Sequence, residues 1–154
     1  MKKLILFISI LILILVGIHL FPSKISNTQE QEAKSVVLDF GEKLKMVSIL
    51  APKKTVVKDI QDNYSGYVSP DLLNQWESDP SKAPGRITSS PWPDRIEIAS
   101  VAKQGNDSYK IEGKVIEITS VEAEKGGVAN SYVVNIEVQK IGNKWLITEF
   151  EKIK

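Results

Sequence analysis

The chain has 154 residues and a formal net charge of +1, with one histidine and no cysteine. The absence of cysteine excludes disulfides, thiolate nucleophiles, cysteine-ligated metals and a lipidated cysteine anchor. The single histidine, His19, lies in an apolar leader, so the rest of the chain has no histidine base. A charge near zero argues against a nucleic-acid-binding protein, which usually carries a clear basic excess.

The first 21 residues are a candidate membrane segment. Lys2 and Lys3 precede an apolar run of 18 residues, Leu4–Phe21. That length approaches the roughly 20 residues that a bilayer-spanning helix requires, and no A-x-A-like cleavage site follows. The sequence therefore predicts a single-pass signal anchor at residues 1–21 and a polar linker at 22–27. The two lysines place the C-terminal part outside the cytoplasm; the alternative is a cleaved signal peptide and a secreted domain.

Helices are predicted after the linker. Thr28 is a typical N-cap with Gln31 completing a capping box, and apolar residues then recur at helical spacing until Pro52. A second helix is predicted over residues 55–64. A third covers residues 69–76, where a serine cap precedes a proline at the first helical position. The apolar positions of the long first helix are Ala33, Val36, Val37, Phe40, Leu44 and Val47.

From Arg95 onward the apolar period changes to two, which is typical of strands. In the second strand the apolar phase changes near Gly113, so a bulge or bend is expected there. Helices followed by four hairpin-connected strands predict an α+β domain over residues 28–154. Its N-terminal helices should pack on a curved four-stranded antiparallel sheet. The predicted strands begin at Arg95 and then cover residues 108–123, 131–141 and 144–153, with a Gly142-Asn143 hairpin turn before the last.

Three segments of the chain resemble the cystatin-like, NTF2-like superfamily. They are the long amphipathic first helix, YVSPDLLNQW (residues 67–76) and GNKWLITEF (residues 142–150). The resemblance covers residues 28–154 and implies a cone-shaped fold with a cavity between helix and sheet. It does not imply one activity, because this fold hosts enzymes, binding modules and assembly domains.

Catalysis in the cavity that the resemblance implies would require tyrosines and carboxylates. Enzymes of this fold often pair His or Tyr with Asp, and the candidates here are Tyr109, Tyr132 and Glu149. If the last two strands pair regularly, Glu149 lies on the apolar face and is a candidate buried base with a raised pKa. A bulge near Thr148 would instead turn Glu149 outward and Phe150 inward, which the apolar spacing favours.

The stretch PGRITSSPWPDRIEI, residues 84–98, leads into the first strand. Its prolines keep the chain extended and hold Trp92 stiffly. In one interpretation Trp92 is a lid on the open end of the core, and acidic residues such as Asp94 pair with the nearby arginines. In the other, Trp92 is a rigid anchor flanked by arginines, a composition typical of binding hot spots. The candidate binding residues are Arg86, Trp92, Asp94 and Arg95.

No metal-binding or phosphate-binding motif is present, so no metal and no cofactor is predicted. The leading hypothesis is a non-enzymatic, membrane-anchored extracytoplasmic domain for binding or assembly. Its expected partners are the membrane, through the N-terminal helix, and a protein or another cell-envelope component. The alternative is a small-molecule-binding protein or cavity enzyme of the same fold. A polar pocket lined by Tyr, Asp or Glu between helix and sheet would favour the alternative, whereas a space filled by side chains would favour the binding module.

Overall fold

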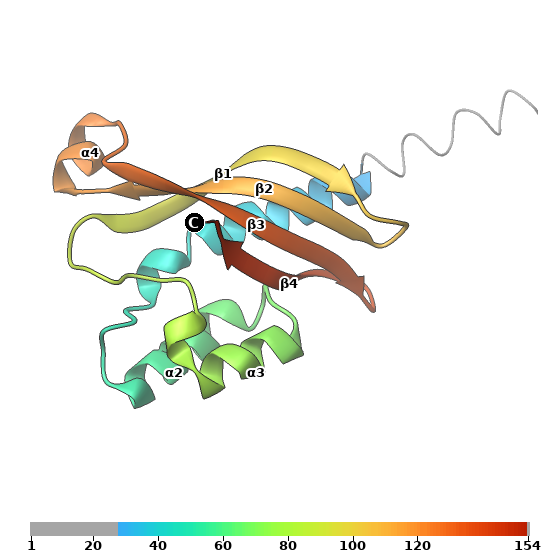
Figure 1. Cartoon of the computed structure of the whole chain (residues 1–154), viewed down its shortest axis with the longest axis horizontal. Helices are drawn as coiled ribbons and strands as arrows, with labels where there is room; N and C mark the ends of the chain where they lie inside the picture. Colours follow the sequence, from blue (N-terminus) through green and yellow to red (C-terminus); the bar gives the residue numbers. More distant parts are fainter. Residues whose placement is uncertain (1–27, 154) are drawn as a thin grey trace, which may run out of the picture. The chain divides into compact units, whose positions relative to one another are not determined.

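Four antiparallel strands form one sheet in the order β1-β2-β3-β4, as seen in a computed structural model that describes residues 28–153 (Figure 1). Each strand is paired with the next one in sequence, so the predicted meander is confirmed. Helices precede the sheet, and the domain is of the α+β class, as expected. The strands are β1 (Trp92–Lys103), β2 (Ser108–Ile118), β3 (Asn130–Ile141) and β4 (Lys144–Lys152).

The helical part differs from the prediction in its first element. The first helix ends at Gly41, not at Pro52. The chain then turns and becomes extended at Val47, whose carbonyl accepts a hydrogen bond from the Arg86 amide at 2.8 Å. Backbone hydrogen bonds to Arg86 therefore take the place of the helical hydrogen bonds that were expected to continue to Pro52. The helical elements before the sheet are the helix of residues 28–41, η1 (Leu44–Met46), α2 (Lys53–Tyr64), α3 (Pro70–Ser78) and η2 (Pro80–Lys82).

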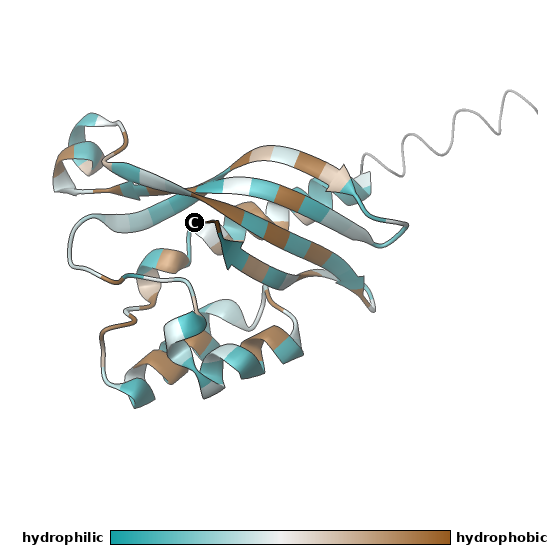
Figure 2. Ribbon diagram, viewed as in Figure 1, coloured by the Kyte–Doolittle hydropathy of each residue, from teal (hydrophilic) through white to brown (hydrophobic). Residues whose placement is uncertain are grey.

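The core lies between the helices and one face of the sheet. In Figure 2, apolar and polar residues alternate along the strands, as expected where one face is buried. Aromatic rings fill the space between the elements. The Phe40 ring lies 4.8 Å from Tyr64, 6.1 Å from Trp76 and 5.8 Å from Phe150, measured between ring centroids. The helices and the sheet therefore share one close-packed interior.

The connection between α2 and α3 runs beside the outer edge of β4. The Ser69 amide donates to the Ile147 carbonyl at 2.8 Å, and the Ile147 amide donates to the Tyr67 carbonyl at 2.9 Å. Ser69 then caps α3 by accepting a hydrogen bond from the Leu72 amide. The cap serine that the sequence predicted therefore begins the helix directly after this contact with the sheet.

The bulge expected in β2 near Gly113 is not in that strand. The β2–β3 ladder is regular, and β1 carries the shifts, one of them directly after the Ile98–Gly113 pair. A side chain at Gly113 would meet the Ile96 Cγ2 atom at 3.0 Å, so the glycine allows β1 to approach closely. The change in apolar phase along β2 has another cause, because residues on both faces of the strand are buried there. Val115 faces the main core, whereas Ile116 is buried on the opposite face, outside that core.

The second strand is also shorter than predicted. It ends at Ile118, and a short helix, α4 (Ser120–Lys125), occupies the part that was expected to continue the strand to Ala123. The physical reason is a capping box in which the Thr119 side chain accepts from the helix backbone and the Glu122 carboxylate accepts from the Thr119 amide at 2.9 Å.

The predicted anchor at residues 1–21 and the linker at 22–27 lie outside the described residues. Within residues 28–153, no helix is long and apolar enough to cross a membrane. The chain divides into two units at Glu32 and Ala33, and all the sites described below lie in the second unit, Ala33–Lys154.

Candidate functional site

Two hollows in the second unit contain residues that the sequence singled out. The first depends on the position of Arg86, which two backbone hydrogen bonds fix. The Arg86 amide donates to Val47, and the Arg86 carbonyl accepts from the Ile49 amide at 2.9 Å. The preceding Gly85 makes this approach possible, because a Cβ atom there would lie 2.6 Å from the Val47 carbonyl oxygen. This pairing brings the proline-rich segment against the chain that follows η1.

The hollow that results is called here the Arg86–Trp92 depression. It is an open concavity of about 420 Å³. Met46 is 57% exposed, and Trp92 is half-buried and lies outside the apolar core. The Nε atom of Arg86 is buried and has no hydrogen-bond partner among the described residues. The depression therefore combines two accessible apolar side chains with an unsatisfied guanidinium donor. It is lined by Lys45, Met46, Arg86, Ser89 and Trp92.

Beside the depression, Asp94 and Arg95 pair mainly with each other and with their neighbours. Asp94 lies 3.6 Å from the Lys45 ammonium and 3.2 Å from the Arg95 guanidinium. Arg95 also donates to Glu97 at 2.6 Å, and this hydrogen bond is the main cause that raises the pKa of Arg95. Of the four candidate binding residues, the structure thus brings Arg86 and Trp92 into one hollow. Asp94 and Arg95 lie next to it with their charges satisfied.

The three cavity candidates are not brought together. Tyr109 is 1% exposed, and its ring packs on Trp145 with 5.3 Å between centroids. Tyr132 pairs with Val115 on β2. Tyr109 lies six residues from Val115 along the same strand, so about 20 Å separates Tyr109 from the position of Tyr132. Tyr109 is thus a core residue distant from Tyr132.

Glu149 is exposed because of the bulge that the apolar spacing favoured. Val138 pairs with Ile147 and Glu137 pairs with Glu149, which leaves Thr148 as the additional residue in β4. Phe150 consequently turns inward and contacts the aromatic core. The alternative of a buried Glu149 base is therefore wrong.

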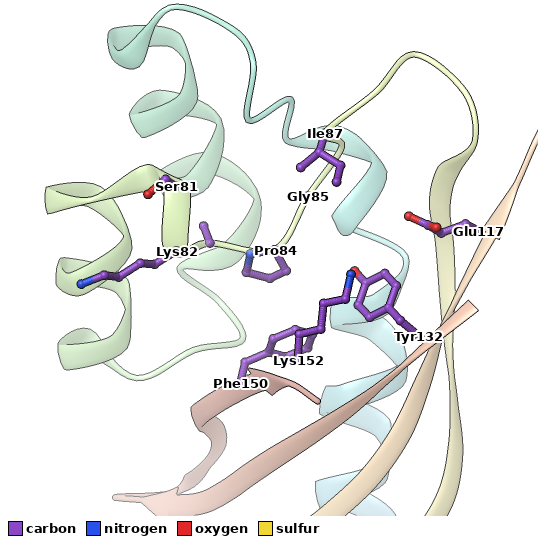
Figure 3. Close-up of a pocket in the computed structure, with 10 residues that line it drawn as sticks. Ser81, Lys82, Pro84, Gly85, Ile87, Glu117, Tyr132, Phe150 and Lys152 are labelled. Atoms are coloured by element: carbon purple, nitrogen blue, oxygen red, sulfur yellow. The ribbon is translucent and has the colours of Figure 1, made fainter. Parts of the chain in front are cut away.

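The second hollow is a cavity of about 200 Å³ at one end of the sheet, called here the Tyr132 pocket (Figure 3). Tyr132 lies on β3 between Glu117 of β2 and Lys152 of β4. The register places all three on the face that carries the core: Val115 pairs with Tyr132, and Val134 pairs with Lys152. The opposite wall is the segment that follows α3. The pocket is lined by Ser81, Lys82, Ala83, Pro84, Gly85, Ile87, Glu117, Tyr132, Phe150 and Lys152.

Electrostatics set the state of the Tyr132 hydroxyl. Burial, followed by the negative charge of Glu117, raises the pKa of Tyr132 to about 12. The hydroxyl is therefore neutral at physiological pH and available as a hydrogen-bond donor. The Lys152 ammonium lies 4.0 Å from the centre of the Tyr132 ring, in a cation–π contact. The Glu117 carboxylate accepts a hydrogen bond from the Asn130 side-chain Nδ2 at 2.6 Å.

Sequence reasoning identified Tyr132 but missed Glu117 and Lys152. One signal was available for Glu117, because it continues the inward set of Tyr109, Ile111 and Val115 at the same period of two. A carboxylate in that phase marks the point where the buried face of the strand becomes polar. The sequence contains no comparable indication that Lys152 faces the core side of the sheet. The bulge at Thr148 reverses which residues of β4 face inward, so simple alternation fails beyond it.

Within residues 28–153, no group of three or more His, Asp or Glu side chains is arranged to hold a metal ion. No protein-family model matches this chain, and no curated protein matches it either. Among solved structures, the chain is similar to a SEC-C motif containing protein from Rhodopseudomonas palustris, known from a solution structure. The two share 12% sequence identity and a TM-score of 0.42, over 69% of this chain and 77% of the other. A likeness this distant supports no inference about family or function.

Proposed function

We propose that the domain is a non-enzymatic binding or assembly module of the cystatin-like, NTF2-like type. In this proposal the anchor at residues 1–21 holds it outside the cytoplasm, and it recognises a protein or another cell-envelope component through the Arg86–Trp92 depression. Phe40, Tyr64, Trp76 and Phe150 fill the space between the helices and the sheet, which supports a module over a cavity enzyme. The polar Tyr132 pocket at one end of the sheet instead supports the small-molecule alternative.

The observation that carries the proposal is the Arg86 guanidinium. A buried donor without a partner has an unfavourable free energy of about 1–3 kcal/mol. In this proposal the Arg86 side chain shifts on binding, so that an acceptor group of the partner reaches the Nε atom. Trp92 and Met46 offer apolar contact directly beside it. Arginine and tryptophan are also the residues most enriched in binding hot spots. The chemistry fits a partner segment with an acceptor, such as a carboxylate or a backbone carbonyl, next to an apolar side chain.

The test is capture of partners from the protein's own membranes by the full-length chain and three variants. Arg86→Ala and Trp92→Ala should each lose the captured partner, with binding weakened by about 2 kcal/mol or more. Val121→Ala is the control, because Val121 is an exposed apolar residue on α4, outside the depression. If the same proteins are recovered equally with all three variants, the depression is not the binding surface.

Folding of the variants must be measured in parallel. Because Trp92 is half-buried and outside the core, Trp92→Ala should cost less than the 3–5 kcal/mol typical of a truncated core aromatic. A loss in that range would identify Trp92 as the lid of the core, and the loss of binding would then follow from unfolding.

Retention of the leader is tested separately. Intact-mass analysis of protein extracted from membranes should give the full 17.2 kDa chain. The length of the apolar run and the missing cleavage site motivate this expectation. A mature chain that starts between Pro22 and Glu30 would show instead that the domain is secreted.

A further inference from the structure

The Tyr132 pocket has two opposite charges that do not neutralise each other. Lys152 and Glu117 form no salt bridge, either with one another or with any other residue in the part of the chain that the structure describes. Tyr132 lies between them on the central strand β3 (Figure 3). A ligand that enters the pocket therefore meets a cation on one side and an anion on the other.

The side chains around these charges hold them in place. The Lys152 ammonium is over the Tyr132 ring, and the Glu117 carboxylate is fixed by the hydrogen bond from Asn130. The Tyr132 hydroxyl adds a neutral donor at the same end. These two contacts restrict the side chains and so reduce the conformational entropy that is lost on binding, which favours affinity.

The rest of the pocket is small and mainly apolar. Its two other polar residues are Ser81 and Lys82, and the Lys82 ammonium lies 3.6 Å from Asp79 in a salt bridge. Ile87 is 58% exposed although it is large and apolar, and Phe150 contributes an aromatic wall. The volume of about 200 Å³ is below the usual 300–1,000 Å³ of drug-sized ligand sites. It equals the liquid volume of about seven water molecules, so the site suits only a small ligand.

We propose that the Tyr132 pocket binds a small zwitterion with an apolar side chain, the chemical class of the free apolar α-amino acids. The ligand carboxylate lies at the Lys152 ammonium and the Tyr132 hydroxyl. The ligand ammonium lies at the Glu117 carboxylate. The ligand side chain packs against Ile87 and Phe150. This site is distinct from the Arg86–Trp92 depression, so the two proposals stand or fall separately.

Calorimetric titration of the full-length chain in detergent tests the proposal, with leucine as the probe. Leucinamide lacks the carboxylate, N-acetyl-leucine lacks the ammonium, and glycine lacks the side chain. Leucine should bind saturably, and each of the three analogues should bind at least roughly tenfold more weakly, which corresponds to about 1.4 kcal/mol. Absence of saturable leucine binding, or equal binding of leucine and its analogues, overturns the proposal.

Variants of Lys152 and Glu117 test which of the two residues binds the ligand carboxylate and which binds the ligand ammonium. Lys152→Met keeps most of the apolar stem and should remove the preference for leucine over leucinamide. Glu117→Gln should remove the preference for leucine over N-acetyl-leucine. Lys103→Met, at the exposed end of β1, is the control and should leave both preferences unchanged. Because Lys152 is itself exposed, its variant should fold normally. A folded Lys152→Met protein that retains the preference for leucine over leucinamide contradicts the assignment.

Discussion

Gly41, the last residue of the first helix, lies against β1 of the sheet. A Cβ atom added there would lie 2.6 Å from the Ile96 backbone nitrogen and 3.0 Å from both Ile96 Cβ and Ile96 Cγ1. The nearest atom belongs to the backbone of β1, which the pairing of Ile96 with Val115 holds in the sheet. Ile96 cannot move away without disturbing the ladder. Gly41→Ala should therefore force the helix and the sheet apart.

The magnitude follows from two opposing effects. Overpacking a well-packed interior typically costs about 1–3 kcal/mol, and a contact to backbone at 2.6 Å belongs at the upper end of that range. Replacing glycine also restricts the unfolded chain, which stabilises the protein by about 0.4–1 kcal/mol. The expected net loss for Gly41→Ala is about 2 kcal/mol in the free energy of unfolding.

The matched control is Gly66→Ala. Gly66 lies in the turn after α2, where an added Cβ meets nothing within 4 Å, and its backbone is not in the left-handed region. Only the unfolded-state effect remains, so Gly66→Ala should leave stability unchanged or raise it by up to about 1 kcal/mol. Urea unfolding, followed by tryptophan fluorescence, measures the stability of both variants. The unfolding midpoints are compared provided that the m-value, the slope of the free energy of unfolding against urea concentration, is unchanged. Equal midpoints for the two variants would refute the close-contact argument.

Three other outcomes are expected from the same unfolding assay. Tyr64→Phe removes the hydrogen bond from the Tyr64 hydroxyl to the Pro84 carbonyl at 2.7 Å and should cost about 0.5–1.5 kcal/mol; an unchanged midpoint would mean that water replaces the hydroxyl. Ser69→Ala removes the cap of α3 and should cost about 0.5–2 kcal/mol, whereas Ser69→Thr should recover most of the loss. Stability should also fall in alkali. Burial raises the pKa of Tyr64 well above its usual value and that of Tyr132 to about 12, so the folded state holds protons that the unfolded state releases above a pH of about 10. The contribution is complete below a pH of about 10 and is lost as the pH rises toward the folded values. Tyr132→Phe should flatten this loss, and an alkaline profile identical to that of the parent would contradict the assignment.

The sheet was predictable because its signals are local. A period of two and the Gly142-Asn143 turn together define the β3–β4 hairpin, and the outward position of Glu149 followed from apolar spacing alone. The end of the first helix was not predictable in this way. The apolar stripe continues through Leu44 and Val47, which are buried in a 3-10 turn and an extended segment instead of in a helix. That change depends on the pairing with Arg86, a contact across about 40 residues that no local pattern encodes.

In the candidate sites, too, some features follow from local sequence patterns and others depend on tertiary contacts. Arg86 and Trp92 are six residues apart in one stiff segment, so their proximity could be inferred from sequence. Lys45 and Met46 join them only through tertiary pairing. The Tyr132 pocket draws its charges from separate strands, and their meeting depends on register and on a bulge. Sequence patterns thus located Arg86, Trp92 and Tyr132 but not the charges of Lys45, Glu117 and Lys152, which also line the two hollows.

The chain segment that runs beside β4 has a consequence for association between copies of the protein. Residues 67–69 occupy hydrogen-bonding groups along one border of the sheet, whereas no strand pairs with the outer border of β1 among the described residues. A sheet extends into a filament only if each copy has two unpaired edge strands, so that one edge pairs with the preceding copy and the other with the next copy. On β4 the hydrogen bonds at Ile147 obstruct strand addition, so a second copy is expected to add at β1, β1 against β1, in a closed twofold pair. The contact at Ile147 therefore works against growth of this domain into a continuous intermolecular sheet.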